Sequence, residues 1–286
     1  MKSITQKTSI LSCKEIMFGF GQVAQLYTHT PSMMIWRACE YAAYNRYMLP
    51  EPILDVGCGD GQYFRLVWPA IKNVVGVDID VSALGAANIS GVYSAVHNVP
   101  AVSMSFPPHS FASAFANCSL EHMDNVDVVL KNVCRVLQPG GKFLLSVTTD
   151  KFLEWTTLPQ LMKVLKMPLI EEHLLEKYKA YHHLVSAFTP EVWANTLDEA
   201  GFDVLEHIPI VPEILGRFNM FTDMLWHVPL DPCGEFSSVL EPYFQGLNNF
   251  PEELGNIVRS LLNMEKSPHI AAGAVFMARK REAGNA

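Results

Sequence analysis

The sequence predicts an α/β fold built on a doubly wound, mostly parallel sheet, and two observations carry this prediction. Between residues 51 and 150, short apolar runs of strand length alternate with stretches of helical periodicity. Strands that alternate with helices pair in parallel through right-handed crossovers. In addition, a glycine-rich loop directly follows the first apolar run, at the place where open α/β sheets bind ligands.

Seven strands are expected from apolar runs that turn residues bound on both sides. In chain order these runs cover residues 53–56, 73–78, 92–96, 111–117, 142–148, 202–208 and 269–279. Core helices are expected over residues 82–89, 125–137 and 189–200. Ser82 is the expected N-cap of the first of these helices. Thr189 followed by Pro190 is a strong start signal for the last.

The rest of the chain is expected to add helices to this core. Residues 16–48 have a helical pattern, with Pro31 opening a second helix. Residues 155–181 form a helical stretch that Pro168 breaks, and residues 211–266 mix helix and loop. The expected organisation is an N-terminal helical lid segment (1–50), the ligand-binding half of the core (51–150), a cap insertion (151–188), a core helix and strand (189–210), a second cap insertion (211–268), and the final core strand with the tail (269–286).

The composition indicates a sizeable hydrophobic core. Of the 286 residues, 49% are hydrophobic and 17% are charged, which argues against disorder. The formal net charge is −8 and no basic run with interleaved aromatic residues occurs, so no nucleic-acid partner is expected. Residues 1–12 lack the apolar centre of a signal peptide. No apolar stretch approaches the length of about 20 residues that a transmembrane helix needs.

The cysteines are scattered through apolar surroundings and form no C-x-x-C pair. They are Cys13, Cys39, Cys58, Cys118, Cys134 and Cys233. This spacing predicts no structural zinc site. Reduced, buried thiols of this kind are typical of a cytoplasmic protein, so a cytoplasmic location is expected.

The glycine-rich loop is flanked by two acids that end neighbouring strands. Asp55 ends the first strand, and the loop that follows contains Gly57, Gly59 and Gly61. Glycines let the backbone turn tightly and let a ligand approach closely. Asp78 ends the next strand, about 20 residues on, where an acceptor for ribose hydroxyls is expected. The pattern therefore indicates a nucleotide-containing ligand.

Four segments in this region resemble the motifs of the class I S-adenosylmethionine-dependent methyltransferases, in that family's order and spacing. Asp55-Val56-Gly57-Cys58-Gly59-Asp60-Gly61 is similar to motif I, and Val77-Asp78-Ile79-Asp80 is similar to motif II. Asn117-Cys118-Ser119-Leu120-Glu121-His122 resembles the segment after the fourth strand, and Arg135-Val136-Leu137-Gln138-Pro139-Gly140-Gly141-Lys142 the turn into the fifth. The resemblance, which is to the methyltransferase type 11 group, implies a Rossmann-like fold and S-adenosylmethionine as the cofactor.

The resemblance also implies residue roles. The residues implied to hold the amino-acid end of the cofactor are Asp55 and the loop residues Gly57, Cys58, Gly59 and Gly61. Asp78 is implied to accept both ribose hydroxyls, Ile79 to pack on the adenine, and Asn117 to lie beside the cofactor. The chain departs from the family after the third strand, where an acid usually meets the adenine amino group. Asn98 is the candidate for that contact and His97 the alternative.

The acceptor is expected to bind where the N-terminal segment and the two insertions meet, above the carboxyl ends of the strands. The second insertion contains a run of Met and aromatic residues: Phe218, Met220, Phe221, Met224, Leu225, Trp226 and His227. Such residues suit an adaptable apolar pocket, ordinary helix packing, or a weak contact with a membrane surface, although no basic face accompanies them. Tyr27, Trp36 and Arg37 are candidates to close over the site.

A base is needed if the acceptor is a neutral hydroxyl or a protonated amine. His122, just after the fourth strand, is the first candidate, and His182 and His183 in the first insertion are the alternatives. Glu121 is expected to position the loop rather than to act as the base. His182 and His227 could together bind a metal, but nothing at ligand spacing supports this, so no metal site is expected.

The function implied is methyl transfer to an oxygen or nitrogen of a small or medium-sized organic acceptor, such as a natural-product, glycan or lipid intermediate. One alternative is a dehydrogenase, which the G-x-G-x-G spacing disfavours. A second is a non-catalytic regulatory protein that binds the cofactor. A third is a methyltransferase acting on a peptide or protein carboxylate, which would need no base because a carboxylate is already ionised.

Overall fold

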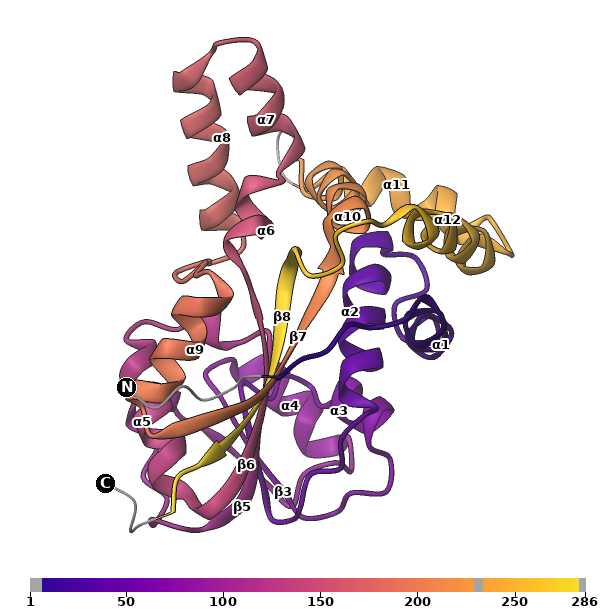
Figure 1. The fold of residues 1–286 in the computed structure, drawn as a ribbon. Coiled ribbons are helices and arrows are strands. Elements are labelled where there is room, and N and C mark those ends of the chain that lie inside the picture. Colours follow the sequence, from indigo (N-terminus) through magenta and orange to yellow (C-terminus); the bar gives the residue numbers. More distant parts are fainter. Residues whose placement is uncertain (1–6, 229–233, 283–286) are drawn as a thin grey trace.

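The structure is a computed structural model that describes residues 7–228 and 234–282, and one eight-stranded sheet lies at its centre (Figure 1). Its strands are β1 (Lys7–Thr8), β2 (Ile53–Val56), β3 (Val74–Asp78), β4 (Ala95–Asn98), β5 (Phe111–Asn117), β6 (Leu137–Thr148), β7 (Phe202–Pro212) and β8 (Ala271–Lys280). Their order across the sheet is β1-β7-β8-β6-β5-β2-β3-β4. Only β8 runs antiparallel to its neighbours, β6 and β7. The expected α/β fold with a mostly parallel sheet is confirmed.

The strand that the sequence did not predict is β1. It pairs two residues with the outer edge of β7, with Lys7 opposite Glu206. A two-residue strand is too short to produce a periodic pattern. The sheet therefore has eight strands instead of the expected seven.

The strand order reverses between β2 and β5. From β2 the chain moves outward to β3 and β4, and it then returns to place β5 on the other side of β2. Open α/β sheets bind ligands at the carboxyl ends of the strands at such a reversal. The loop after β2 and Asn117 at the end of β5 meet at this point.

The helices are α1 (Cys13–Val23), α2 (Pro31–Tyr44), α3 (Gln62–Val67), α4 (Val81–Ile89), α5 (Val126–Val136), α6 (Asp150–Glu154), α7 (Thr157–Val164), α8 (Pro168–Tyr181), α9 (Pro190–Glu199), α10 (Glu213–Trp226), α11 (Ser237–Gln245) and α12 (Phe250–Met264). Two short 3₁₀ turns, η1 (Ala101–Ser103) and η2 (Leu120–His122), precede and follow β5. The start signals at Pro31 and Thr189 are confirmed, since Pro31 opens α2 and the Thr189 side chain caps α9.

Several boundaries differ from the predictions, and β7, for example, continues to Pro212 instead of ending at residue 208. Asp80, not Ser82, is the N-cap of α4, because its carboxylate accepts the backbone N–H groups of Ser82 and Ala83. β4 begins at Ala95 instead of residue 92, because its parallel register with β3 begins only there. β6 begins at Leu137 instead of residue 142, because Leu137 already pairs with β5 ahead of an irregularity in the ladder.

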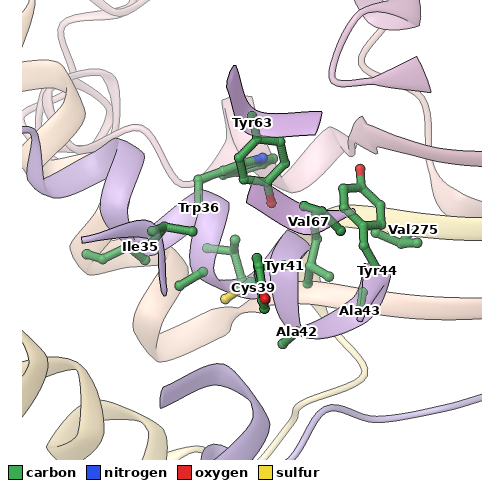
Figure 2. Packing of buried hydrophobic residues seen from close by; sticks show 14 of the residues in the cluster. Ile35, Trp36, Cys39, Tyr41, Ala42, Ala43, Tyr44, Tyr63, Val67 and Val275 are labelled. Atoms are coloured by element: carbon green, nitrogen blue, oxygen red, sulfur yellow. The ribbon is translucent and has the colours of Figure 1, made fainter. Parts of the chain in front are cut away.

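Apolar side chains cover both faces of the sheet. On one face α2 packs its buried residues against the sheet and against α3, and Figure 2 shows Trp36 and Tyr44 of α2 near Tyr63 of α3 and Val275 of β8. On the other face α5 and α9 enclose a second core, which includes Leu130 of α5. This two-sided burial explains why the core strands are apolar along their length.

The cap elements lie beyond the carboxyl end of β6. In Figure 1 the chain leaves β6 into α6, and α7 and α8 project from the sheet as a hairpin beside α10. Several apolar side chains of this hairpin are exposed: Leu161, Val164, Leu165, Met167, Leu169 and Ile170. Among the described residues, no helix combines the length and the apolar character needed to cross a membrane.

Candidate active site

A cavity of about 140 Å³ lies at the reversal point of the sheet. It is lined by Tyr27, Arg37, Asp55, Gly57, Cys58, Gly59, Asp60, Gly61, Tyr63, Phe64, Phe115 and Asn117. Six residues expected at the cofactor line it: the five of the β2 loop region and Asn117. Tyr27 and Arg37, expected to close over the site from the N-terminal segment, also line it. Trp36 is instead buried in the core.

The glycines of the loop serve two different needs. All three have positive φ, near 75° at Gly57 and Gly61 and 53° at Gly59. A Cβ at Gly57 would lie 2.5 Å from Ser119, and one at Gly61 would lie 2.5 Å from the Tyr93 ring. A Cβ at Gly59 would meet no protein atom within 4 Å. Gly57 and Gly61 are therefore required by packing within the protein, whereas Gly59 borders open space in the cavity.

Asp55 is held by a tyrosine that the sequence analysis missed. Tyr93 donates its hydroxyl hydrogen bond to Oδ2 of Asp55 at 2.7 Å. Burial raises the pKa of Asp55 to about 7, and the nearby charge of Asp78 acts in the same direction. Tyr93 precedes β4, within residues 92–96 that the sequence predicts to be a strand, and no local signal marks its contact with Asp55.

Asp78 braces the glycine loop from the end of β3. Its Oδ2 accepts the N–H of Gly59 at 2.8 Å, and its Oδ1 accepts the N–H of Asp80 at 2.9 Å. Each carboxylate oxygen has a second lone pair, so both oxygens keep acceptor capacity. Asp78 lies outside the cavity lining but is joined to it through Gly59.

Ile79 and Asn98 form an open shelf next to Asp78. The Ile79 side chain is 71% exposed and leaves an apolar surface free. The Asn98 amide donates to the backbone carbonyls of Asp78 and Ile79 at 3.1 and 3.0 Å. This pairing commits the Asn98 nitrogen, so its side-chain oxygen is the group left to meet a ligand. His97 instead packs edge-on against Phe106.

A buried carboxylate lies behind Arg37, and the sequence analysis missed it. Glu40 of α2 is fully buried. Its Oε1 accepts bonds from three side chains: Trp36 at 3.1 Å, Cys118 at 2.9 Å and Ser146 at 2.7 Å. Arg37 donates to Oε2 at 2.6 Å. A lone acid inside an otherwise apolar and aromatic helix was the signal that could have found it.

Glu121 ties the loop after β5 to the first insertion. Its Oε1 accepts the N–H of Thr148 at 3.0 Å, and its backbone carbonyl accepts the N–H groups of Val185 and Ser186. Burial raises the pKa of Glu121 to about 7. Its Oε2 is buried without a hydrogen-bond partner among the described residues.

The three candidate histidines do not share one position. His122 is exposed on η2, and its Nδ1 lies 3.4 Å from the backbone carbonyl of His183. His182 turns the other way, toward Asp223 and His227 of the second insertion. None of the three lines the described cavity. From the sequence, His182 and His227 could together bind a metal, but no ligand spacing indicates that they meet an acid, because they belong to different insertions.

Cys58 occupies the loop as a packed thiol. It is 8% exposed, and its sulfur lies so close to Gly76 that a Cβ there would come within 2.6 Å. Burial raises its pKa, so it is protonated at neutral pH. Cys233 lies outside the described residues.

Residues 54–145 match the family model described as a methyltransferase domain. Residues 54–145 form a class I methyltransferase domain. The matched range begins one residue before Asp55 and includes Asp78, Asn98 and Asn117. S-adenosylmethionine is the cofactor of this domain.

The described residues fit this cofactor. Asp55 and Asp78 place two carboxylates beside a glycine loop whose central residue borders open space. Carboxylates suit a ligand that carries positive charge and ribose hydroxyls. The exposed face of Ile79 suits an aromatic ring.

Curated relatives of the methyltransferase domain act at different atoms. The chain is 28% identical over 130 residues to a malonyl-[acyl-carrier protein] O-methyltransferase of Erwinia billingiae, covering 45% of this chain and 51% of the relative. It is 28% identical over 202 residues to a sterol 4-C-methyltransferase of Caenorhabditis elegans, covering 58% and 60%. The chain thus spans only about half to three fifths of the length of these relatives.

The likeness of fold extends beyond the matched domain. An S-adenosylmethionine-dependent methyltransferase of Thermotoga maritima superposes with a TM-score of 0.54 at 14% identity, covering 94% of this chain and 100% of that one. At this identity the comparison establishes the shared fold alone. The Rossmann-like character of the core is confirmed.

Proposed function

We propose that the chain transfers the methyl group of S-adenosylmethionine to an oxygen or nitrogen of a small or medium-sized organic acceptor. The observation that supports this most is the convergence, at one reversal point, of the Asp55–Gly61 loop, Asp78 and Asn117. Arg37 and Tyr27 line the same cavity from the N-terminal segment. A cofactor site and an acceptor site would therefore share one space.

The proposed cofactor contacts divide the site into two ends. Asp55, the loop backbone and Asn117 would hold the amino-acid end within the cavity. Asp78 would accept the ribose hydroxyls with its remaining lone pairs. Ile79 would pack on the adenine, and the Asn98 oxygen would accept a hydrogen bond from the adenine amino group.

When bound, the cofactor supplies an electrophilic methyl group, so the protein must align the acceptor and, where needed, remove its proton. Arg37 is placed to orient an anionic group, because its Nε is buried without a partner among the described residues and Glu40 fixes its other end. The buried Glu40 carboxylate thus positions Arg37 rather than reacting.

His122 remains our proposed base for an acceptor that needs one. It lies on η2, directly after the strand that ends at Asn117, and it is exposed to an incoming acceptor. Glu121 in the same turn has an oxygen without a described partner, but that oxygen is buried, and its other oxygen holds Thr148. We assign Glu121 to positioning the turn. His183 is the alternative base because its backbone touches His122.

We propose only a broad chemical class for the acceptor. A natural-product, glycan or lipid intermediate suits a site covered by two helical insertions. The two relatives are named as an O-methyltransferase and a C-methyltransferase, so they do not indicate which acceptor atom is methylated. An acceptor carboxylate, including that of a peptide or protein, would make His122 dispensable.

A weak membrane-surface contact, if the acceptor is a lipid, would use the α7–α8 hairpin. A membrane-surface contact was one of three alternatives for the Met-rich run of the second insertion, beside an apolar pocket and ordinary helix packing. Met220, Met224 and Trp226 of that run are instead buried by packing. A group of exposed apolar side chains lies on the hairpin, with Lys163 and Lys166 among them. The cytoplasmic location expected from the cysteines stays a prediction.

The proposal is tested with cofactor carrying a labelled methyl group and a panel of hydroxyl, amine and carboxylate acceptors. Transfer of label to one acceptor class, lost in Asp78→Ala, is the expected result. Tight binding of S-adenosylhomocysteine without label transfer to any acceptor would favour the non-catalytic alternative. Absence of cofactor binding would contradict the proposal altogether.

A further inference from the structure

Three side chains from the two insertions converge in the cap, away from the cavity described above. His182 follows the last residue of α8, Asp223 lies in the last turn of α10, and His227 follows the end of α10. One nitrogen or oxygen of each lies within 4.8 Å of the others. Nε2 of His182 is 3.1 Å from Oδ2 of Asp223, and Nε2 of His227 is 3.8 Å from Oδ1.

We propose that His182, Asp223 and His227 bind one divalent transition-metal ion, Zn²⁺ in the first place, which ties the end of α8 to the end of α10. Two imidazole nitrogens and a carboxylate are a ligand set that zinc takes in proteins. Zinc binds such ligands at about 2.0–2.2 Å in tetrahedral geometry, which sets neighbouring ligand atoms about 3.4 Å apart. The two distances to Asp223 lie on either side of that value.

The surroundings orient His227 and Asp223 as metal ligands. Nδ1 of His227 lies 3.1 Å from a carboxylate oxygen of Glu235. A metal-bound histidine commonly donates its other ring N–H to a carboxylate, which turns the remaining nitrogen's lone pair toward the metal. Here that remaining nitrogen is Nε2, which faces Asp223. Tyr178 donates a hydrogen bond to the Asp223 carboxylate and so fixes its orientation.

A second observation points to a missing ligand between the residues. Nε2 of His182 is buried and forms no hydrogen bond with good geometry to any described residue, although a carboxylate oxygen is only 3.1 Å away. A nitrogen this close to an acceptor normally aligns its N–H with it. A cation between the His182 nitrogen and the Asp223 carboxylate would accept a lone pair from each of them. Asp223 is itself only 8% exposed, and a cation beside it would stabilise its charged form.

The site joins two insertions that are far apart in the chain and that already touch through Tyr178 and Met220. The first insertion supplies His182, and the second supplies Asp223, His227 and Glu235. A metal ion there would fix the hairpin of α7 and α8 against α10. This inference concerns the cap and does not depend on the proposed methyl transfer.

The full-length protein, stripped with a chelator and dialysed, is titrated with Zn²⁺ by calorimetry and separately with Co²⁺. The expected result is one ion per chain. The cobalt form should show d–d bands of tetrahedral intensity without thiolate charge-transfer bands. Failure to bind one equivalent of Zn²⁺ would overturn the proposal, and the cluster would then be a hydrogen-bonded ion pair. Thiolate bands would also overturn it, because they would place the ion at cysteines.

Substitutions at a proposed ligand and at the residue that orients it test where the ion binds. His227→Ala should weaken zinc binding by at least about 100-fold, and Glu235→Gln, which leaves all three ligands in place, by about 10- to 100-fold. The matched control is His173→Ala, an exposed histidine on α8, which should bind as the parent does. Zinc should raise the melting temperature of the parent and of His173→Ala but not that of His227→Ala. If His227→Ala fails to fold, Glu235→Gln decides, and parental zinc affinity in that variant would contradict the site.

Discussion

The Tyr93 hydroxyl donates a hydrogen bond to Oδ2 of Asp55 at 2.7 Å and also lies 3.2 Å from the backbone carbonyl oxygen of Cys58. One hydroxyl thus joins the acid that ends β2 to the loop that follows it. The Tyr93 ring also fills the space beside Gly61. The glycine loop is therefore held in shape by a side chain from the segment just before β4.

Cofactor affinity should depend on pH through Asp55. Burial raises the pKa of Asp55 to about 7, and only the ionised carboxylate attracts a positively charged amino group. Affinity for S-adenosylhomocysteine should therefore rise with pH through about 7, by up to about tenfold per unit below it. Calorimetry at several pH values checks this, and Asp55→Asn should give a flat profile between about pH 6 and 8.

Tyr93→Phe should shift this pH profile of cofactor affinity. The Tyr93 hydrogen bond lowers the pKa of Asp55, so its removal should move the rise in affinity to higher pH. Tyr243→Phe, at an exposed tyrosine of α11, is the control that should leave the profile unchanged. The same carboxyl keeps its proton in the folded state between its usual pKa of 3.8 and about 7. Its contribution to the free energy of unfolding therefore falls as pH rises across that window.

Asp78→Ala should lose about 1.5–3 kcal/mol of cofactor binding, the scale of hydrogen bonds to a charged group. Asp78 also holds the N–H groups of Gly59 and Asp80, so part of the loss would come from a looser loop. Calorimetry with S-adenosylhomocysteine measures it. Unchanged affinity would remove Asp78 from the site.

The two insertions should become less mobile when the site is filled. Val185 and Ser186 of the first insertion are bonded to the carbonyl of Glu121 beside the site. The second insertion packs α10 on α2, which carries Arg37. Hydrogen exchange in residues 151–188 and 211–268 should slow when S-adenosylhomocysteine is added. Equal exchange with and without ligand would show that these segments only pack on the core.

His122→Ala should lower turnover by about 10²–10⁴ for a hydroxyl or amine acceptor while cofactor affinity stays nearly unchanged, because general-base catalysis contributes on that scale. Steady-state rates and calorimetry on the same preparation separate the two effects. His109→Ala, a histidine beside Leu137 at the far end of β5 and β6, is the control. Full activity in His122→Ala would leave His183 to test, or an acceptor that needs no base.

The sequence predicted the parts of the site that are local in the chain. Asp55, the glycines and Asp78 stand at strand ends, where the alternation of strands and helices places them at one edge of the sheet. Tyr93 and Glu40 were missed because their contacts join residues far apart: Tyr93 to Asp55, and Glu40 to Ser146. Such contacts depend on how the helices and strands pack, and the hydrophobic periodicity of the sequence does not indicate this packing.

For the helices, too, the sequence predicts local features but not how distant segments pack. Pro31, Thr189 and Pro190 mark helix starts through their own backbone chemistry, so those starts were predicted. The meeting of His182 with His227 depends on the packing of α7 and α8 against α10, which no local signal in either insertion reports. The predicted order of the strands likewise does not indicate that His122 is exposed and lies outside the cavity lining.

The central claim is that the Asp55–Gly61 loop binds S-adenosylmethionine, and a pair of glycine variants tests it most directly. Gly59 and Gly91 both have positive φ, 53° and 71°, and a Cβ at either would meet no protein atom within 4 Å. Valine therefore imposes a similar backbone strain at both positions, but only at Gly59 would it enter the cofactor's space. Calorimetry should show that Gly59→Val no longer binds S-adenosylhomocysteine while Gly91→Val binds as the parent does, with both folded by circular dichroism. Parental affinity in a folded Gly59→Val would contradict the claim.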